Sequence, residues 1–193
     1  MGANLFCWDW VYEQMRSIVN LKRPVLLGRA KPVLRILVRK PVGFSEPFSI
    51  VSKRSIIMVK KIVKDEFFLK QKSEPATKAD QQVAIDLLDT LKANEAGCVG
   101  LAANMIGVRK CVIAVSMGFM NVAMFNPVII SKSGEYEAEE GCLSLTGTRP
   151  CTRYENIEVE YYDINWNKKC SKFSGWTAEI IQHEIDHCNG III

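Results

Sequence analysis

Histidine is very scarce in this sequence: its 193 residues contain only two, His183 and His187. This excludes a metal site with three imidazole ligands inside one chain. There is also no C-x-x-C pair, so the usual spacing of a structural zinc site is missing. Whatever histidine chemistry the chain performs must therefore be concentrated in one pentapeptide, residues 183–187.

Long apolar runs and paired cysteines are missing too. No uninterrupted apolar stretch reaches the roughly 18 residues that a transmembrane helix needs, so we expect no membrane partner. Seven cysteines, an odd number without paired spacing, argue against a disulfide framework and indicate a reducing compartment. The pattern of a secretory signal is also absent. These absences favour the cytoplasm.

The basic character of the chain is confined to residues 1–57. This segment holds ten Lys and Arg against three Asp and Glu, together with four of the seven prolines. We consider three interpretations: a disordered basic extension, an organelle transit peptide, or sequence upstream of a true start at Met58. Residues 58–193, with fifteen basic and eighteen acidic side chains, form the expected catalytic domain and do not favour DNA binding.

Hydrophobic periodicity predicts an α+β fold for residues 58–193. Thr77 and Asp80 resemble a capping signal, and the apolar residues at 83, 87 and 91 predict an amphipathic helix ending near Gly97. Short β-type runs follow at 111–115, 122–125, 128–130 and 157–162. Ser174 and Gly190 bound a last helix. We expect mostly antiparallel sheets packed around this C-terminal helix, with an N-terminal amphipathic helix.

The last predicted helix carries the sequence His183-Glu184-Ile185-Asp186-His187. Positions i and i+4 share one helix face, so both imidazoles can bind a single divalent metal, with Glu184 beside it as a general base. Such a short pattern also occurs by chance on ordinary helix surfaces, so by itself it leaves both interpretations open. Asp186 is a candidate to orient a ligand or a neighbouring helix.

A catalytic metal usually has three protein ligands, and with no third histidine the third must be Cys, Asp or Glu. Cys142 is the best candidate, although a lone cysteine is more often a small buried residue. Gly141 allows close backbone approach, and Glu140 suits a plain core strand poorly. A third segment, 97–107, is rich in glycine and alanine, which predicts backbone packed against a substrate or a strand, or merely a tight loop.

Three segments together resemble the signature motifs of the peptide deformylase family. They are Gly100-Leu101-Ala102-Ala103-Asn104, Glu140-Gly141-Cys142-Leu143-Ser144 and Gln182-His183-Glu184-Ile185-Asp186-His187. Supporting matches are Asn126-Pro127, Arg149 and Asp163. The resemblance covers about residues 58–193 and says nothing of residues 1–57.

The resemblance implies a metal-dependent hydrolase that removes the formyl group from formyl-methionyl nascent peptides, with the ribosome as an expected partner. Its metal ligands would be Cys142, His183 and His187, holding iron(II) first, with nickel, cobalt or zinc as alternatives. Glu184 would move the proton of the attacking water, and the backbone N–H of Leu143 would stabilise the oxyanion. The substrate-binding residues implied are Val99, Gly100, Arg149 and Ile180.

Two departures from the family pattern bear on the rate and the stability. Met105 stands where the family places a glutamine that donates to the oxyanion, and Cys98 stands where it places a glycine. Because methionine has no N–H, we expect a reduced rate. The sequence also stops at Ile193, whereas family members usually continue, which bears on stability more than on chemistry.

Two other functions remain open at this point. A catalytically impaired relative that binds metal and peptide N-termini would suit a damaged oxyanion hole, but it would not need Glu184. A HExxH peptidase is disfavoured by the cysteine-containing second motif, because peptidases normally take His or Glu as the third ligand.

Overall fold

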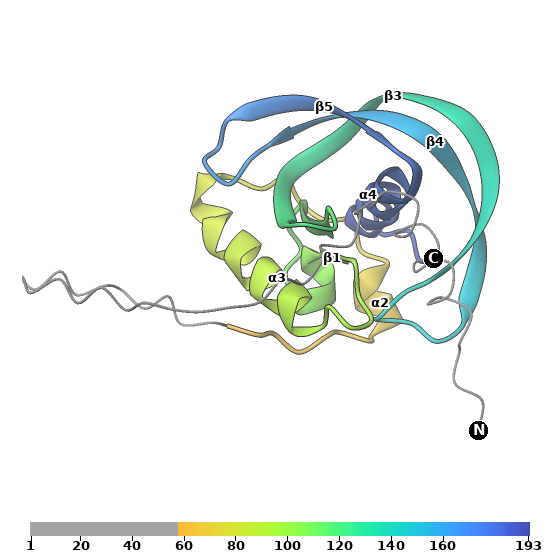
Figure 1. The fold of residues 1–193 in the computed structure, drawn as a ribbon. Helices are drawn as coiled ribbons and strands as arrows, with labels where there is room; N and C mark the ends of the chain where they lie inside the picture. The colour runs from red at the N-terminus through yellow and green to blue at the C-terminus, as the bar shows by residue number, and fades with distance from the viewer. Residues whose placement is uncertain (1–57) are drawn as a thin grey trace, which may run out of the picture. The chain divides into compact units, whose positions relative to one another are not determined.

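A computed structural model describes residues 58–193 (Figure 1). Its helices are α2 (Glu66–Leu69), α3 (Gln81–Ala93) and α4 (Gly175–Cys188), with 3-10 turns η1 (Lys78–Asp80) and η2 (Ala103–Ile106). Its strands are β1 (Gly100–Ala102), β2 (Val112–Ser116), β3 (Asn121–Gly141), β4 (Thr148–Tyr162) and β5 (Lys168–Ser174). None of these helices has the length and apolar character needed to cross a membrane.

The five strands form one antiparallel sheet in the order β1-β2-β3-β4-β5. Figure 1 shows β3, β4 and β5 curving around α4. The long pairing of β3 with β4 shifts register near Asn126, whose positive φ of 50° bends the strand before Pro127. This curvature gives α4 contacts with both ends of the sheet, β1 and β2 as well as β4 and β5.

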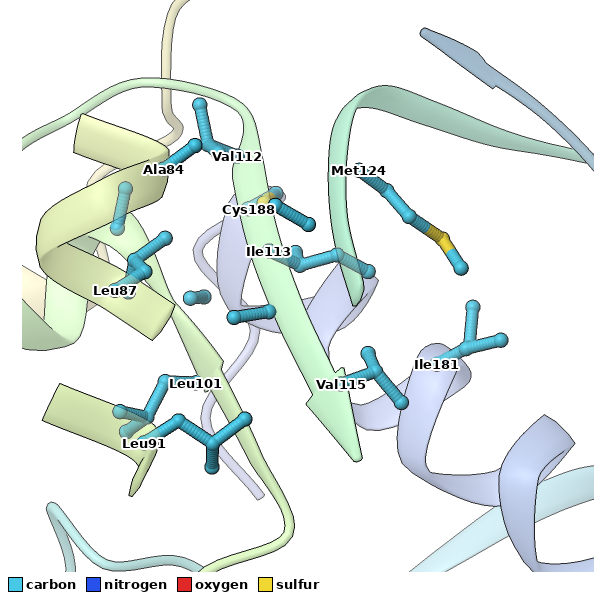
Figure 2. Close-up of a cluster of buried hydrophobic side chains, with 14 of the residues drawn as sticks. Ala84, Leu87, Leu91, Leu101, Val112, Ile113, Val115, Met124, Ile181 and Cys188 are labelled. Carbon is cyan, nitrogen blue, oxygen red and sulfur yellow. The ribbon is translucent and has the colours of Figure 1, made fainter. Parts of the chain in front are cut away.

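The hydrophobic core lies on both sides of β2 (Figure 2). Leu87 and Leu91 of α3 pack on one side of this strand, and Ile181 of α4 lies on the other. All three are at most 1% exposed. The stripe at 83, 87 and 91 thus predicted the face of α3 that enters the core. Because α4 packs against β1, β2, β4 and β5, several of its polar side chains are buried.

The predicted α+β class with an antiparallel sheet is confirmed, but several boundaries differ. The runs predicted at 122–125 and 128–130 belong to one strand, β3, and the polar strand β5 and the short elements β1 and α2 were not predicted. Helix α3 ends at Ala93 rather than near Gly97, because Asn94 caps it through backbone and side-chain bonds to Thr90 O. The basic segment 1–57, with its three interpretations, lies outside the described residues.

Candidate metal centre

Helix α4 presents both histidines on one buried face. Ser174 occupies its N-cap position, as predicted, although its side chain makes no capping bond, and Gly190 follows its end with a φ of 75°. The Nε2 atoms of His183 and His187, one helical turn apart, lie 3.1 Å from each other. Burial, with a smaller contribution from the neighbouring His183, lowers the pKa of His187 to about 3, so its ring is neutral, as a metal ligand requires.

Cys142 reaches the two histidines from the turn between β3 and β4. Its Sγ lies 3.2 Å from His187 Nε2 and accepts the Ser144 N–H at 3.4 Å. The ligand atoms of these cysteine and histidine residues all lie within 4.8 Å of one another. Atoms that bind one metal tetrahedrally at about 2.0–2.3 Å are about 3.3–3.6 Å apart, so this arrangement fits a single ion.

A buried network of ion pairs holds the Nδ1 side of the His183 ring. The ring Nδ1–H of His183 donates to Glu140 Oε2 at 2.7 Å, which turns Nε2 toward Cys142 and His187. Arg153 donates to both Glu140 oxygens, at 2.7 and 2.8 Å, and to Asp186 Oδ2 at 2.7 Å. Burial raises the pKa of Glu140, but the hydrogen bonds from His183 and Arg153 lower it by more than burial raises it. The resulting pKa is about 2. Glu140 is therefore a carboxylate at neutral pH.

We expect Arg153→Ala to lower the free energy of unfolding by about 3–5 kcal/mol, measured by denaturant titration of the metal-free protein. The reason is that two carboxylates, Glu140 and Asp186, would lose their buried cation. The matched control is Lys168→Ala, which breaks the exposed pair with Glu160 and should cost less than about 1 kcal/mol. Equal losses in the two variants would contradict this account of the network.

Glu184 lies against Gly100, in the first of the three motif segments, and one of its carboxylate oxygens has no polar partner among residues 58–193. It is 3% exposed, and its Oε2 has no hydrogen bond within the described part of the chain. A Cβ at Gly100 would stand 2.5 Å from Glu184 Oε1 and 2.7 Å from Ile180 Cγ2, so only glycine permits this approach. Burial raises the pKa of Glu184 to about 7, against a lowering by His183. A carboxyl group so tuned can both accept and return a proton.

The other predicted site residues flank this centre in the chain or pair with it across the sheet. Val99 precedes Gly100 and is 39% exposed, while Leu143 follows Cys142 and is 37% exposed. Arg149 lies opposite Glu140 across the β3–β4 pairing, yet its side chain extends toward Glu66, with Nη2 3.8 Å from Oε1. Ile180 also lies against Gly100, and the Arg149 guanidinium is paired with an acidic side chain.

The two residues that depart from the family's first motif, Met105 and Cys98, lie on either side of β1. Met105 is 1% exposed, and its Sδ accepts the Ala102 N–H at 3.4 Å. The Cys98 thiol donates to the Gly100 carbonyl at 3.0 Å. Burial and the nearby Glu184 raise the pKa of this thiol to about 12, so it stays protonated. Met105 acts as an acceptor and offers no donor.

Three residues that contribute to the site received no role in the sequence analysis, although two of them, Asn104 and Gln182, belong to its motifs. Arg153 joins Glu140 to Asp186, and Asn104 donates to the His187 carbonyl at 2.8 Å. Gln182 ties α4 to β4 through two bonds with the Tyr154 backbone, at 3.0 and 2.9 Å. An amide or guanidinium among apolar neighbours was the signal available, because such groups are buried only when they are paired.

The fold and the site define a class. A helix bearing two histidines, with a glutamate between them and a cysteine against them, is typical of metal-dependent hydrolases. Comparison of the sequence with family models matches residues 59–193 to the polypeptide deformylase family. The chain belongs to this family.

Individual peptide deformylases are also similar to this chain in sequence. The chain is 60% identical over 136 residues to a peptide deformylase of Clostridium beijerinckii, covering 70% of this chain and 100% of that protein. A peptide deformylase of Pelotomaculum thermopropionicum is 41% identical over 127 residues, covering 64% and 81% of the two chains.

Solved structures resemble the fold as well. A peptide deformylase from Legionella pneumophila matches with a TM-score of 0.63 and 33% identity, over 69% of this chain and 83% of that one. An actinonin-bound class I type b peptide deformylase from Acinetobacter baumannii matches with a TM-score of 0.63 and 32% identity, over 70% and 95%. The same enzyme with Met-Ala-Ser bound is also similar, with a TM-score of 0.63 and 30% identity, over 71% and 97%.

Proposed function

We propose that this protein removes the N-terminal formyl group from formyl-methionyl polypeptides. The observation that carries the proposal is the convergence of Cys142, His183 and His187 beside the buried carboxyl group of Glu184, in a member of the deformylase family. These three side chains would hold one divalent metal. Iron(II) is the first candidate, and nickel, cobalt or zinc are alternatives.

A bound divalent metal supplies Lewis-acid chemistry: it lowers the pKa of water toward neutrality and polarises a carbonyl group. Glu184 takes the proton of the water that attacks the formyl carbon. Its raised pKa, about 7, suits it to return the same proton to the leaving amine, which frees formate and the peptide amino group. Glu184 Oε2 accepts no hydrogen bond from residues 58–193, which leaves this oxygen available for that proton.

Stabilisation of the oxyanion is the weak part of the site. The backbone N–H of Leu143, next to Cys142, is the donor we propose. Met105 contributes none, because its Sδ is an acceptor. Losing one such donor typically costs about 10²–10³ in kcat. We therefore expect turnover to be slower than in a relative with glutamine at this position.

The substrate is expected to lie along β1. Val99 and Gly100 would contact the peptide, and Ile180, which packs against Gly100, would contact the methionine side chain. Arg149, whose guanidinium is paired with Glu66, is a further residue that we expect to contact the peptide. The expected partners are nascent peptides, at the ribosome. The compartment we propose is the cytoplasm, and the bacterial relatives give no support to the organelle alternative.

The direct test is formate release from a formyl-Met tripeptide, using protein purified anaerobically and loaded with iron(II) or nickel. We expect formate in amounts equal to new free amino groups, and no cleavage of internal peptide bonds. Acetyl-Met tripeptide is the matched control substrate, since its N-acyl group differs from formyl only by a methyl group in place of the hydrogen. Internal cleavage without formate would replace the proposal by a peptidase.

Met105 favours one second candidate, a catalytically impaired relative that binds peptide N-termini. Such a protein would hold the formyl-Met tripeptide without releasing formate. Retention of Glu184 in a buried and costly position favours the enzyme, because binding alone does not require a proton acceptor there.

A further inference from the structure

The C-terminal end of α4, where His187 lies, is held by groups from outside the helix. The last carbonyls of a helix have no partner within it. Here the Ser73 N–H donates to the Cys188 carbonyl at 2.8 Å, and the Gly190 N–H donates to the His187 carbonyl at 3.1 Å. Two side-chain amides join these backbone donors. Asn189 Nδ2 donates to the Ile185 carbonyl at 3.1 Å, and Asn104 Nδ2, from a distant segment, donates to the same His187 carbonyl at 2.8 Å.

Asn104 is well placed to fix the end of this helix. It belongs to η2, is fully buried, and donates a second, longer bond of 3.4 Å to the Leu69 carbonyl. Because both facing atoms are carbonyl oxygens, only N–H groups can be directed at them, which settles the orientation of the amide. Asn104 therefore joins three segments that are far apart in sequence: the end of α2, the first motif and the end of α4.

The two histidines differ in how their rings are supported. The Nδ1 of His183 has the Glu140 carboxylate as its partner, whereas the Nδ1 of His187 is buried without any hydrogen-bond partner among residues 58–193. A metal-binding histidine is normally oriented by a hydrogen bond to its second ring nitrogen. Since His187 lacks that support, the position of its imidazole depends on the position of its own backbone.

We propose that Asn104 is a positioning residue that places His187 for metal binding by holding its carbonyl. This inference rests on the proposed metal site and extends it to a residue outside the ligand set. Asn104 also precedes Met105 in the same turn, so one short segment would set both the position of His187 and the side chain at the missing donor position.

The test uses the full chain loaded with cobalt(II), and measures the visible absorption bands and the rate of cobalt loss to a chelator. We expect Asn104→Ala to lose cobalt about 10–100-fold faster than wild type, the usual effect of removing a group that supports a ligand, and to shift the cobalt bands. The matched control is Thr90→Ala, which removes another buried side-chain bond to a helix carbonyl, at 2.6 Å to Asp86 O in α3. Its cobalt bands and release rate should equal those of wild type, although it too loses thermal stability.

Asn104→Ser keeps a shorter donor and should give an intermediate release rate; it decides the question if Asn104→Ala does not fold. The proposal would be overturned if the Asn104 and Thr90 variants lost cobalt at the same rate and both kept the wild-type absorption bands. It would also be overturned if the wild-type protein bound no cobalt. The experiment uses no formyl peptide. A wild-type protein that binds cobalt but releases no formate would therefore refute the proposed activity and leave the role of Asn104 standing.

Discussion

Glu184→Gln is expected to lower kcat for formate release by about 10²–10⁴-fold while the protein still binds one metal per chain. An amide has the shape of the carboxyl group but cannot take a proton from water. Because Glu184 is 3% exposed and one of its oxygens has no partner, a neutral side chain there should leave thermal stability equal or higher. The measurements are steady-state kinetics with a formyl-Met tripeptide, metal content, and thermal denaturation.

Glu179→Gln provides the matched control for this substitution. Glu179 lies in the same helix, and its carboxylate accepts a hydrogen bond from the Tyr136 hydroxyl. Its amide variant should turn over at close to the wild-type rate. A Glu184→Gln protein that kept more than a tenth of the wild-type kcat would show that another group moves the proton.

Met105→Gln is expected to raise kcat at least tenfold. The Met105 side chain is buried, and its Sδ takes the Ala102 N–H at 3.4 Å. A glutamine of similar length can accept that N–H through its Oε1 and add an N–H donor for the oxyanion. One such donor is typically worth about 10²–10³ in kcat. Because a transition-state interaction is gained, the increase should lie in kcat more than in KM.

Met105→Leu separates the new donor from simple repacking. Leucine fills a similar volume but offers neither donor nor acceptor, so it should not raise kcat. A rate for Met105→Gln at or below that of wild type would argue that Met105 does not limit turnover. An equal rise in both variants would trace the effect to packing.

The candidate site was more accessible from the sequence than its supporting residues. The spacing of His183 and His187 is local, so the helical period alone predicts that they share a face. The partner of Glu140 is different, because Arg153 reaches it only through the register of β3 on β4. That register depends on tertiary pairing, which no local pattern reveals. Asn104 likewise finds His187 across the core.

The missed parts of the sheet have a similar cause. Residues 131–141 of β3 carry mostly polar, exposed side chains, so they lack the apolar alternation that predicts a strand. They extend because β4 pairs with them along nearly their whole length. Edge strand β5 is also polar and mostly exposed, and it too extends by pairing with β4. Helix α3, in contrast, was predictable because its buried stripe has the helical period.

The separation of Cys142 from His187 gives the proposed metal a mechanical role as well. The two residues are 45 positions apart, and they belong to the β3–β4 turn and to the last turn of α4. An ion bound to both closes the intervening chain into a loop, as a covalent cross-link would, and removes freedom from the unfolded chain. The free energy of ion binding then adds to that of folding, so the concentration of free metal would set the lifetime of the protein as well as its activity.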